Sequence, residues 1–255
     1  MKRFLIQLSY KGTRYVGWQI QPNGSSIQEE IEKALSTLLQ ENIRIFGQGR
    51  TDAGVHALNS YAHFDLENYP KMSLEQLIFK LNRFLPKDIA IKNIVEVSPL
   101  FHARFSAESR SYLYIISTQK NPFTVENSWL LNKKPNIYAM QEAAKYIIGE
   151  HDFSSFCSAK SSLISKKCRV YQADWEEVDE QFLFKIKANR FVMNMVRSLV
   201  GTMTEIGLGK KSIEDMPRIL QAADRKAAGP NADPAGLHLV DVAYPQDLQK
   251  WKTKE

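Results

Sequence analysis

The sequence of 255 residues predicts an α+β protein with two ferredoxin-like halves, each containing a largely antiparallel sheet. Two observations carry this prediction. Segments with alternating apolar residues and segments with helical periodicity follow one another in the order β-α-β-β-α-β, and this order occurs twice. We therefore expect an N-terminal half at residues 1–100 and a C-terminal half at residues 101–255.

The first half is predicted to begin with a half-buried strand, because apolar residues alternate at Phe4, Ile6, Leu8 and Tyr10. Further strands are expected at 43–46, near 61–65 and at 89–97. Two amphipathic helices lie between the strands. Each is expected to begin at a capping-box pair, Ser26 with Glu29 for the first and Ser73 with Gln76 for the second. Pro86 ends the second helix.

The second half repeats this order with longer connections. Strands are predicted at 111–117, 170–178, 182–187 and 237–242. Helices are predicted from about 138 to 148, from about 192 to 206, and after Ser212. Gly149 is placed to end the first of these helices.

The composition excludes several classes of protein. There are 34 Lys and Arg residues against 28 Asp and Glu, and the net charge of +6 permits a polyanionic partner without demanding one. Two cysteines, Cys157 and Cys168, are too few for a disulfide framework or a four-thiolate zinc site. No apolar stretch is long enough to cross a bilayer, and residues 1–10 lack the apolar core of a secretion signal. We expect a cytoplasmic protein.

The strongest local charge asymmetry is a basic, Ser-rich segment followed by an acidic one. The basic residues are Lys160, Lys166, Lys167 and Arg169. This pattern fits either a solvated surface or a mobile loop that meets phosphate groups, and composition does not choose between them.

Several motifs fail on spacing. The run that begins at Gly47 lacks the third glycine of a dinucleotide fingerprint, and Gly209-Lys210 lacks the remainder of a phosphate loop. His56 and His63 are better explained as structural residues than as metal ligands. These motifs therefore support neither a nucleotide cofactor nor a metal site.

The segment from Gly49 to Ala57 remains as the candidate site. It places Asp52 between two glycines, with Arg50 two residues before it, in a turn between two predicted strands. Turn chemistry alone explains such a pattern, because Asp and Gly suit tight turns. The alternative is a presented carboxylate that a neighbouring cation keeps ionised.

The same segment resembles the signature of the TruA family of tRNA pseudouridine synthases. Other motifs in the expected order extend the resemblance over nearly the whole chain: Tyr15 to Gln19, Phe101 to Ala107, His151 to Phe156, Met195 to Arg197 and Gly236 to Leu239. The chain differs from common family residues at Met193, Asn194, Ser198 and His238.

The resemblance implies a role for four residues. Asp52 is the expected catalytic residue, Arg50 its neighbour in the turn, and Tyr112 the residue that packs on the target base. Arg197 is the expected partner of the aspartate. An arginine on a largely apolar helix needs a carboxylate partner, since a buried unpaired charge is costly, and the resemblance implies that this partner is Asp52.

The resemblance also implies the fold, the reaction and the partners. The fold would be that of a pseudouridine synthase, with the two halves joined around a central active-site cleft. Uridine in tRNA would be isomerised to pseudouridine without cofactor, in the anticodon stem-loop at about positions 38 to 40, by a homodimer. One carboxylate suffices because the bonds broken and formed share the same sugar carbon, whereas a glycosidase normally needs two. Whether Asp52 acts as nucleophile or base stays open.

Two other functions stay open at this point. A pair of RNA-binding modules without catalysis would tolerate Asp52→Ala, and a hydrolase using Asp52 would release free uracil from RNA.

Overall fold

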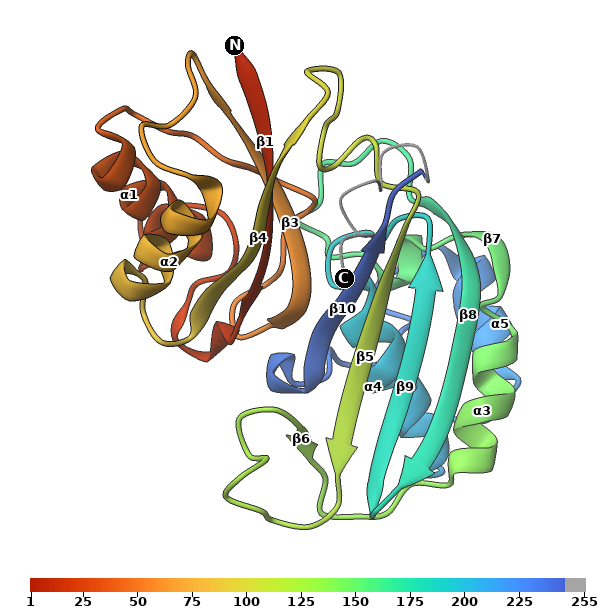
Figure 1. Ribbon diagram of the computed structural model, residues 1–255. Helices are drawn as coiled ribbons and strands as arrows, with labels where there is room; N and C mark the ends of the chain where they lie inside the picture. The colour runs from red at the N-terminus through yellow and green to blue at the C-terminus, as the bar shows by residue number, and fades with distance from the viewer. Residues whose placement is uncertain (246–255) are drawn as a thin grey trace. The chain divides into compact units, whose positions relative to one another are not determined.

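The computed structural model describes residues 1–245 and has a mixed α/β fold with mostly antiparallel strand pairs (Figure 1). The predicted α+β class and the predominance of antiparallel sheet are confirmed. The chain forms two compact units. Unit 1 contains Met1–Glu108 and the described residues from Leu239, and unit 2 contains Ser109–His238.

This division differs from a boundary at residue 100 in two places. Unit 1 extends to Glu108, whose backbone N–H donates to the carbonyl of Ala243. The chain also returns to unit 1 at Leu239. There Tyr244 is fully buried, lies edge-on to Tyr61 and donates its hydroxyl to the carbonyl of Ala103 at 2.8 Å. These long-range contacts leave no local signal in the sequence.

The sheet of unit 1 has the strand order β4-β1-β3, and all these pairs are antiparallel. Its strands are β1 (Lys2–Tyr10), β3 (His56–Leu66) and β4 (Ile89–Val97), with β2 (Phe46–Gly47) paired to β3 and β10 (Leu237–Ala243) following β3. In the β1–β3 register Phe4 lies opposite Phe64, and the two rings stack at 5.4 Å. This face of the sheet forms the core of the unit.

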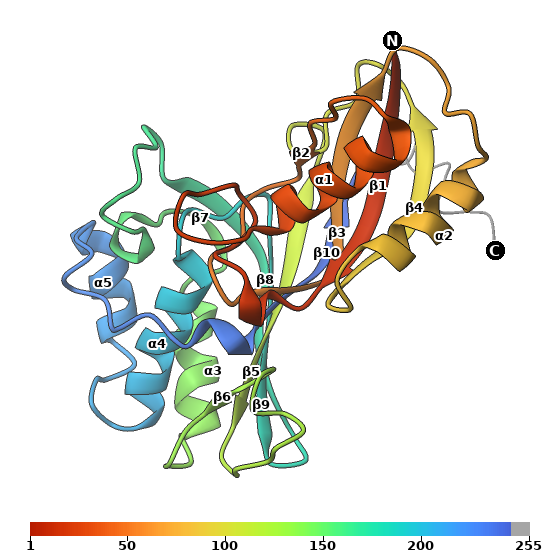
Figure 2. The same cartoon turned by 90° about the vertical axis from the view of Figure 1, so that its left-hand side faces the viewer.

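Helices α1 (Ile27–Leu39) and α2 (Leu74–Phe84) cover the same face of the unit 1 sheet (Figures 1 and 2). Both begin at the predicted caps. Ser26 accepts the Glu29 N–H, and Ser73 and Gln76 form a complete capping box. The short 3₁₀ helix η1 (Gly12–Arg14) lies in the loop between β1 and α1.

The strand predicted at 43–46 is wrong over most of its length. Ile43 and Ile45 are buried, but their backbone N–H groups donate to side chains of α1, at 2.9 Å to Ser36 Oγ and 2.9 Å to Glu32 Oε1. These two apolar residues are therefore buried without forming a paired strand, and β2 begins only at Phe46.

The sheet of unit 2 has the order β5-β9-β8-β7 and is antiparallel along this path. Its strands are β5 (Ser109–Ser117), β7 (Gly149–Asp152), β8 (Lys167–Val178) and β9 (Gln181–Ala188), with β6 (Trp129–Leu130) paired in parallel to β5. Asp179 and Glu180 join β8 to β9, both with positive φ, as two-residue hairpins require.

Helices α3 (Ile137–Lys145), α4 (Met195–Gly207) and α5 (Asp215–Ala222) lie on one face of this sheet (Figure 2). Two 3₁₀ helices complete the unit, η2 (Ser154–Phe156) and η3 (Pro234–Gly236). None of the helices in residues 1–245 combines the length and the apolar character that a membrane crossing requires.

Two predicted helix ends need correction. The helix predicted to reach residue 148 ends at Lys145, and Gly149, with φ of 102°, opens β7. The helix predicted from residue 192 begins at Met195, because Asn194 adopts a left-handed conformation with φ of 64°. The first difference is one of hydrogen bonding, because the N–H groups of Ile147 and Ile148 donate to carbonyls three residues before them and form turns rather than α-helix. The second arises where Asn194 leaves helical dihedral angles.

Candidate functional site

Asp52 lies in the loop of residues 48–55 that joins β2 to β3, here named the Asp52 loop. Its side chain is half-buried and Arg50 is exposed. The Val55 N–H donates to the Asp52 carbonyl at 3.2 Å, and Gly54 supplies φ of 79° to close the turn. The predicted tight turn between two strands is confirmed.

The residue before Asp52 is held on two sides. Thr51 is buried, and its hydroxyl shares a hydrogen bond of 2.8 Å with the hydroxyl of Tyr10. The Thr51 carbonyl accepts the Trp18 N–H at 3.1 Å. At the start of the loop, the Gln48 N–H donates to the Tyr61 carbonyl at 2.8 Å. The backbone around Asp52 is therefore fixed by groups from β1, β3 and the segment of residues 11–18.

That segment, here named the 11–18 loop, packs backbone to backbone against the Asp52 loop. A Cβ atom added to Gly12 would lie 2.0 Å from the Val55 carbonyl oxygen, and one added to Gly17 would lie 2.6 Å from the Thr51 carbonyl oxygen. Only glycine permits this approach at both positions. On its other side, the Trp18 ring packs closely on Gly47.

His56, the last polar residue of the predicted signature, supports the same contact. It is buried, and its Nδ1 accepts the Gly12 N–H at 3.1 Å. Because Nδ1 is the acceptor, a neutral imidazole here carries its proton on Nε2. The structural interpretation of His56 is supported by this geometry.

His63 is also structural. It is buried, and its Nδ1 accepts the Ala103 N–H at 3.2 Å. Burial, assisted by the positive charge of Arg3, lowers the pKa of His63 to about 4. The ring is therefore neutral at physiological pH.

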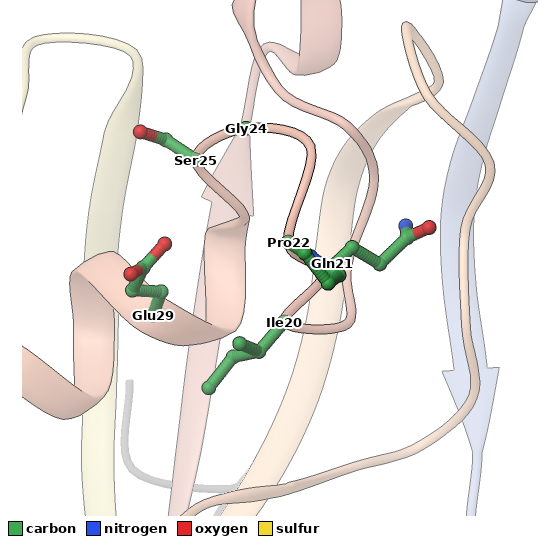
Figure 3. Close-up of a pocket in the computed structure, with 6 residues that line it drawn as sticks. All are labelled: Ile20, Gln21, Pro22, Gly24, Ser25 and Glu29. Carbon is green, nitrogen blue, oxygen red and sulfur yellow. The ribbon is translucent and has the colours of Figure 1, made fainter.

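A shallow depression of about 660 Å³ lies beside the 11–18 loop (Figure 3). It is lined by Ile20, Gln21, Pro22, Gly24, Ser25 and Glu29. Figure 3 shows the Gln21 side chain extending away from Ser25 and Glu29. The charged member of this lining is acidic, so the depression is poorly suited to a phosphate group.

In unit 2, Tyr112 and Tyr114 share one face of β5 but differ in environment. Tyr114 is fully buried and donates to the Asp233 carbonyl at 2.6 Å, and burial raises the pKa of its hydroxyl far above the ordinary value. Tyr112 is half-buried and meets the Phe191 ring edge-on at 5.1 Å. Packing in the core accounts for the tyrosine at position 114, whereas part of the Tyr112 side chain stays accessible to solvent.

Arg197 lies on α4 and is tied to the segment of residues 229–233. Its Nε donates to the Ala232 carbonyl at 2.8 Å, and the Ala232 N–H donates back to the Arg197 carbonyl at 2.9 Å. A Cβ atom added to Gly201, one turn further along α4, would lie 1.8 Å from the Pro230 carbonyl oxygen. The absence of a side chain at Gly201 lets this segment reach the helix and orient the guanidinium.

Each predicted site residue therefore has a defined place within its own unit. Asp52 and Arg50 lie in unit 1, and Tyr112 and Arg197 lie in unit 2. The pairing of Asp52 with Arg197 stays a prediction. Gly12 and Gly17 were not identified from the sequence as supports of the Asp52 loop; the signal was present, because Gly17 belongs to the motif that begins at Tyr15.

Residues that depart from common family choices are mostly structural here. Ser198 is buried in α4, and Asn194 supplies the left-handed residue before this helix. His238 is buried, its Nε2 lies 2.9 Å from the Asn127 carbonyl oxygen, and burial lowers its pKa. Met193 is exposed. Of the four, Met193 is the most exposed, Asn194 is half-buried, and the other two are buried.

The basic segment at 160–169 forms a surface loop that leads into β8. Lys160, Lys167 and Arg169 are exposed, and Ile164 between them is fully exposed. Arg169 forms an ion pair with Glu150 at 3.2 Å. This exposure is compatible both with a solvated surface and with a loop that contacts phosphate groups.

Comparisons with known proteins extend over nearly the entire chain. The family model described as tRNA pseudouridine synthase matches residues 7–106 and 143–245. A tRNA pseudouridine synthase A of Parabacteroides distasonis is 44% identical over 97% of this chain and 98% of its own length. Proteins with the same name are 43% identical in Bacteroides fragilis, over 97% of this chain and 98% of the relative, and 42% identical in Caldicellulosiruptor bescii, over 96% and 100%.

Proposed function

Because the chain belongs to the tRNA pseudouridine synthase family, we propose that it isomerises uridine in the tRNA anticodon stem-loop, with Asp52 as its catalytic residue. Conversion of uridine to pseudouridine in tRNA is the activity of the family. The target, at about positions 38 to 40, and the residue roles are the proposal. The observation that carries it is the Asp52 loop, whose backbone is fixed on both sides while the Asp52 side chain stays partly accessible.

The reaction needs little from the protein beyond a placed carboxylate. The bond between N1 and C1′ of the ribose breaks, the uracil turns, and C5 bonds to C1′. The proton on C5 then passes to solvent and N1, freed from C1′, takes up a proton, so that the product is an isomer of the substrate. Asp52 acts either as a nucleophile on C1′ or as a base toward the sugar. In either role a rigid loop favours catalysis, because the carboxylate loses no freedom at the reacting geometry.

Two residues of unit 2 complete the proposed site. Arg197, oriented by Ala232, would pair with the Asp52 carboxylate and keep it ionised. Tyr112 would stack on the uracil while it turns, using the part of its ring that Phe191 leaves accessible. Arg50, exposed beside Asp52, is suited to a phosphate of the flipped nucleotide.

The oligomer and the compartment belong to the same proposal. We expect a homodimer in the cytoplasm, with basic residues of both subunits contacting the tRNA backbone. Sedimentation at micromolar protein checks the oligomer. A dimer mass is expected, and a monomer mass would contradict this part of the proposal.

The function is tested with tRNA labelled with tritium at C5 of uridine. We expect release of tritium without free uracil, and chemical mapping should place the new pseudouridine at about positions 38 to 40. Release of free uracil would indicate a hydrolase instead. Pseudouridine formed only outside the anticodon stem-loop would contradict the proposed target.

A further inference from the structure

The 11–18 loop, which supports the Asp52 loop, is itself held by hydrogen bonds and an ion pair to one acidic residue, Asp88. The Tyr15 hydroxyl donates to Asp88 Oδ1 at 2.7 Å. Arg14 donates to Asp88 Oδ2 through Nε at 2.8 Å and approaches the same oxygen through Nη2 at 2.7 Å. The Lys11 N–H donates to the Asp88 carbonyl at 2.8 Å. Lys11, Arg14 and Tyr15 thus each attach this loop to Asp88, the residue just before β4.

The carboxylate of Asp88 is held in a definite place. Its side chain retains only 13% of its accessible surface, whereas the Arg14 side chain retains 69%. The turn that carries it is closed by the Ile89 N–H, which donates to the Pro86 carbonyl at 3.0 Å. Asp88 is therefore held in a fixed position in the turn that precedes β4.

The ionisation states agree with this arrangement. Burial works to raise the pKa of Asp88, but the hydrogen bonds from Tyr15 and Arg14 outweigh it, so the pKa lies below its ordinary value. Burial and the Asp88 carboxylate raise the pKa of the Tyr15 hydroxyl well above its ordinary value. At neutral pH an ionised acceptor faces a protonated donor, which makes this a charge-assisted hydrogen bond.

The 11–18 loop, held in this way by Asp88, also contacts the Asp52 loop directly. Gly17 lies against the backbone of Thr51, Asp52 and Ala53, and the Trp18 N–H donates to the Thr51 carbonyl. Gly12 lies against Val55. A shift of the loop by a fraction of an ångström therefore has to be absorbed by the residues on either side of Asp52.

We propose that Asp88 is a positioning residue for Asp52, acting through Tyr15 and the 11–18 loop without touching the substrate. The inference rests on the proposed catalytic role of Asp52. It makes the placement of the carboxylate depend on a residue 36 positions away along the chain, one that belongs to none of the motifs of the predicted site.

The test compares Asp88→Ala with a matched variant, Asp65→Ala. Asp65 also forms a two-bonded pair with an arginine, with Arg3 Nε and Nη2 each at 2.8 Å, and is similarly enclosed, with 22% of its side chain accessible. It has no contact with the 11–18 loop among the hydrogen bonds described for its side chain. Removing either carboxylate costs stability, so urea unfolding should show losses of similar size.

The single-turnover rate of tritium release separates the two variants. For Asp88→Ala we expect this rate at saturation to fall by about 10- to 100-fold, as a displaced reacting group predicts. The protein concentration that gives half the maximal rate should change by less than about threefold. Asp65→Ala should stay within about twofold of wild type. An Asp88→Ala rate equal to that of Asp65→Ala would overturn the proposal.

Two conservative variants keep the test valid if Asp88→Ala does not fold. Asp88→Asn retains an oxygen that accepts from Tyr15 and should recover part of the rate. Tyr15→Phe should lower the rate although Asp88 is intact. If both variants behave as wild type, the proposal fails. Asp52→Asn, assayed in parallel, distinguishes the outcomes, because an active Asp52→Asn would refute the proposed function instead.

Discussion

The substitution Gly17→Ala tests whether the contact between the 11–18 loop and the Asp52 loop is rigid. Gly17 has φ of 113°, and a Cβ atom there would lie 2.6 Å from the Thr51 carbonyl oxygen. Ordinary contact begins at 3.4 Å, so the two backbones would have to separate by 3.4 − 2.6 = 0.8 Å. The nearest atoms are backbone atoms of Thr51, Asp52 and Ala53, which cannot rotate away as a flexible side chain would.

The expected magnitude combines two costs. A left-handed backbone conformation costs an alanine about 1–2 kcal/mol. Displacement of the packed loop by the added methyl group costs about 1–3 kcal/mol more, which gives a loss of about 2–5 kcal/mol in the free energy of unfolding. A displacement approaching 1 Å at the catalytic group lowers rates by up to about 100-fold, so kcat should fall by about 10- to 100-fold in protein that remains folded.

Two other glycines supply the controls for a measurement by urea unfolding. Gly209 has φ of 73° and open space around its Cβ position, so Gly209→Ala isolates the dihedral cost of about 1–2 kcal/mol. Gly49 has open space and lacks a left-handed φ, so Gly49→Ala should change stability by less than about 1 kcal/mol. If Gly17→Ala is no less stable than Gly209→Ala, the loops are not rigidly packed and the reasoning is refuted.

Three further predictions concern other parts of the chain. Between pH 7 and pH 5 the free energy of unfolding of the wild type should fall by about 2 kcal/mol more than that of His63→Asn. The reason is that histidine in the unfolded chain takes up a proton in this range, whereas folded His63, with a pKa of about 4, does not. Equal losses in urea titrations at the two pH values would contradict this prediction. Ser73→Ala should cost about 1 kcal/mol in urea unfolding, with Ser73→Thr recovering most of it, since it breaks the capping box. Gly201→Ala should lower both stability and kcat, because its Cβ would clash with Pro230 in the segment that orients Arg197. An unchanged kcat would argue against the orientation of the Arg197 guanidinium by this segment.

Much of the fold was predictable because its signals are local. The strand at 89–97 has the predicted bounds, since Pro86 ends the helix before it and apolar residues alternate through it. The caps at Ser26 and Ser73 fix two helix starts in the same way. The errors occur where local and tertiary signals conflict, as at Ile43 and Ile45, whose N–H groups are satisfied by side chains of α1.

The candidate site was predictable to a different degree. Asp52 is marked by its glycines, by Arg50 and by the resemblance of the surrounding segment to a known family. Its support is marked less clearly: Gly17 belongs to a motif of the resemblance and Asp88 to none, and each lies about 35 residues from Asp52, in opposite directions along the chain. Only the folded backbone shows that both act on the same turn.

The geometry also changes how charge relates to function. The net charge of +6 suggested a polyanionic partner, yet the depression beside the 11–18 loop has an acidic lining. Exposed Arg50 and the exposed basic residues of the 160–169 loop are better placed for phosphate. Contacts with tRNA should therefore depend on scattered residues, with an overall salt dependence of binding.

The central claim, that one carboxylate in the Asp52 loop carries the isomerisation, is tested most directly by tritium release from tRNA labelled at uridine C5. Wild type should release tritium without free uracil, and Asp52→Asn, which keeps the shape of the side chain, should reduce release to background while the urea unfolding midpoint stays unchanged. A folded Asp52→Asn variant that releases tritium at the wild-type rate would contradict the account.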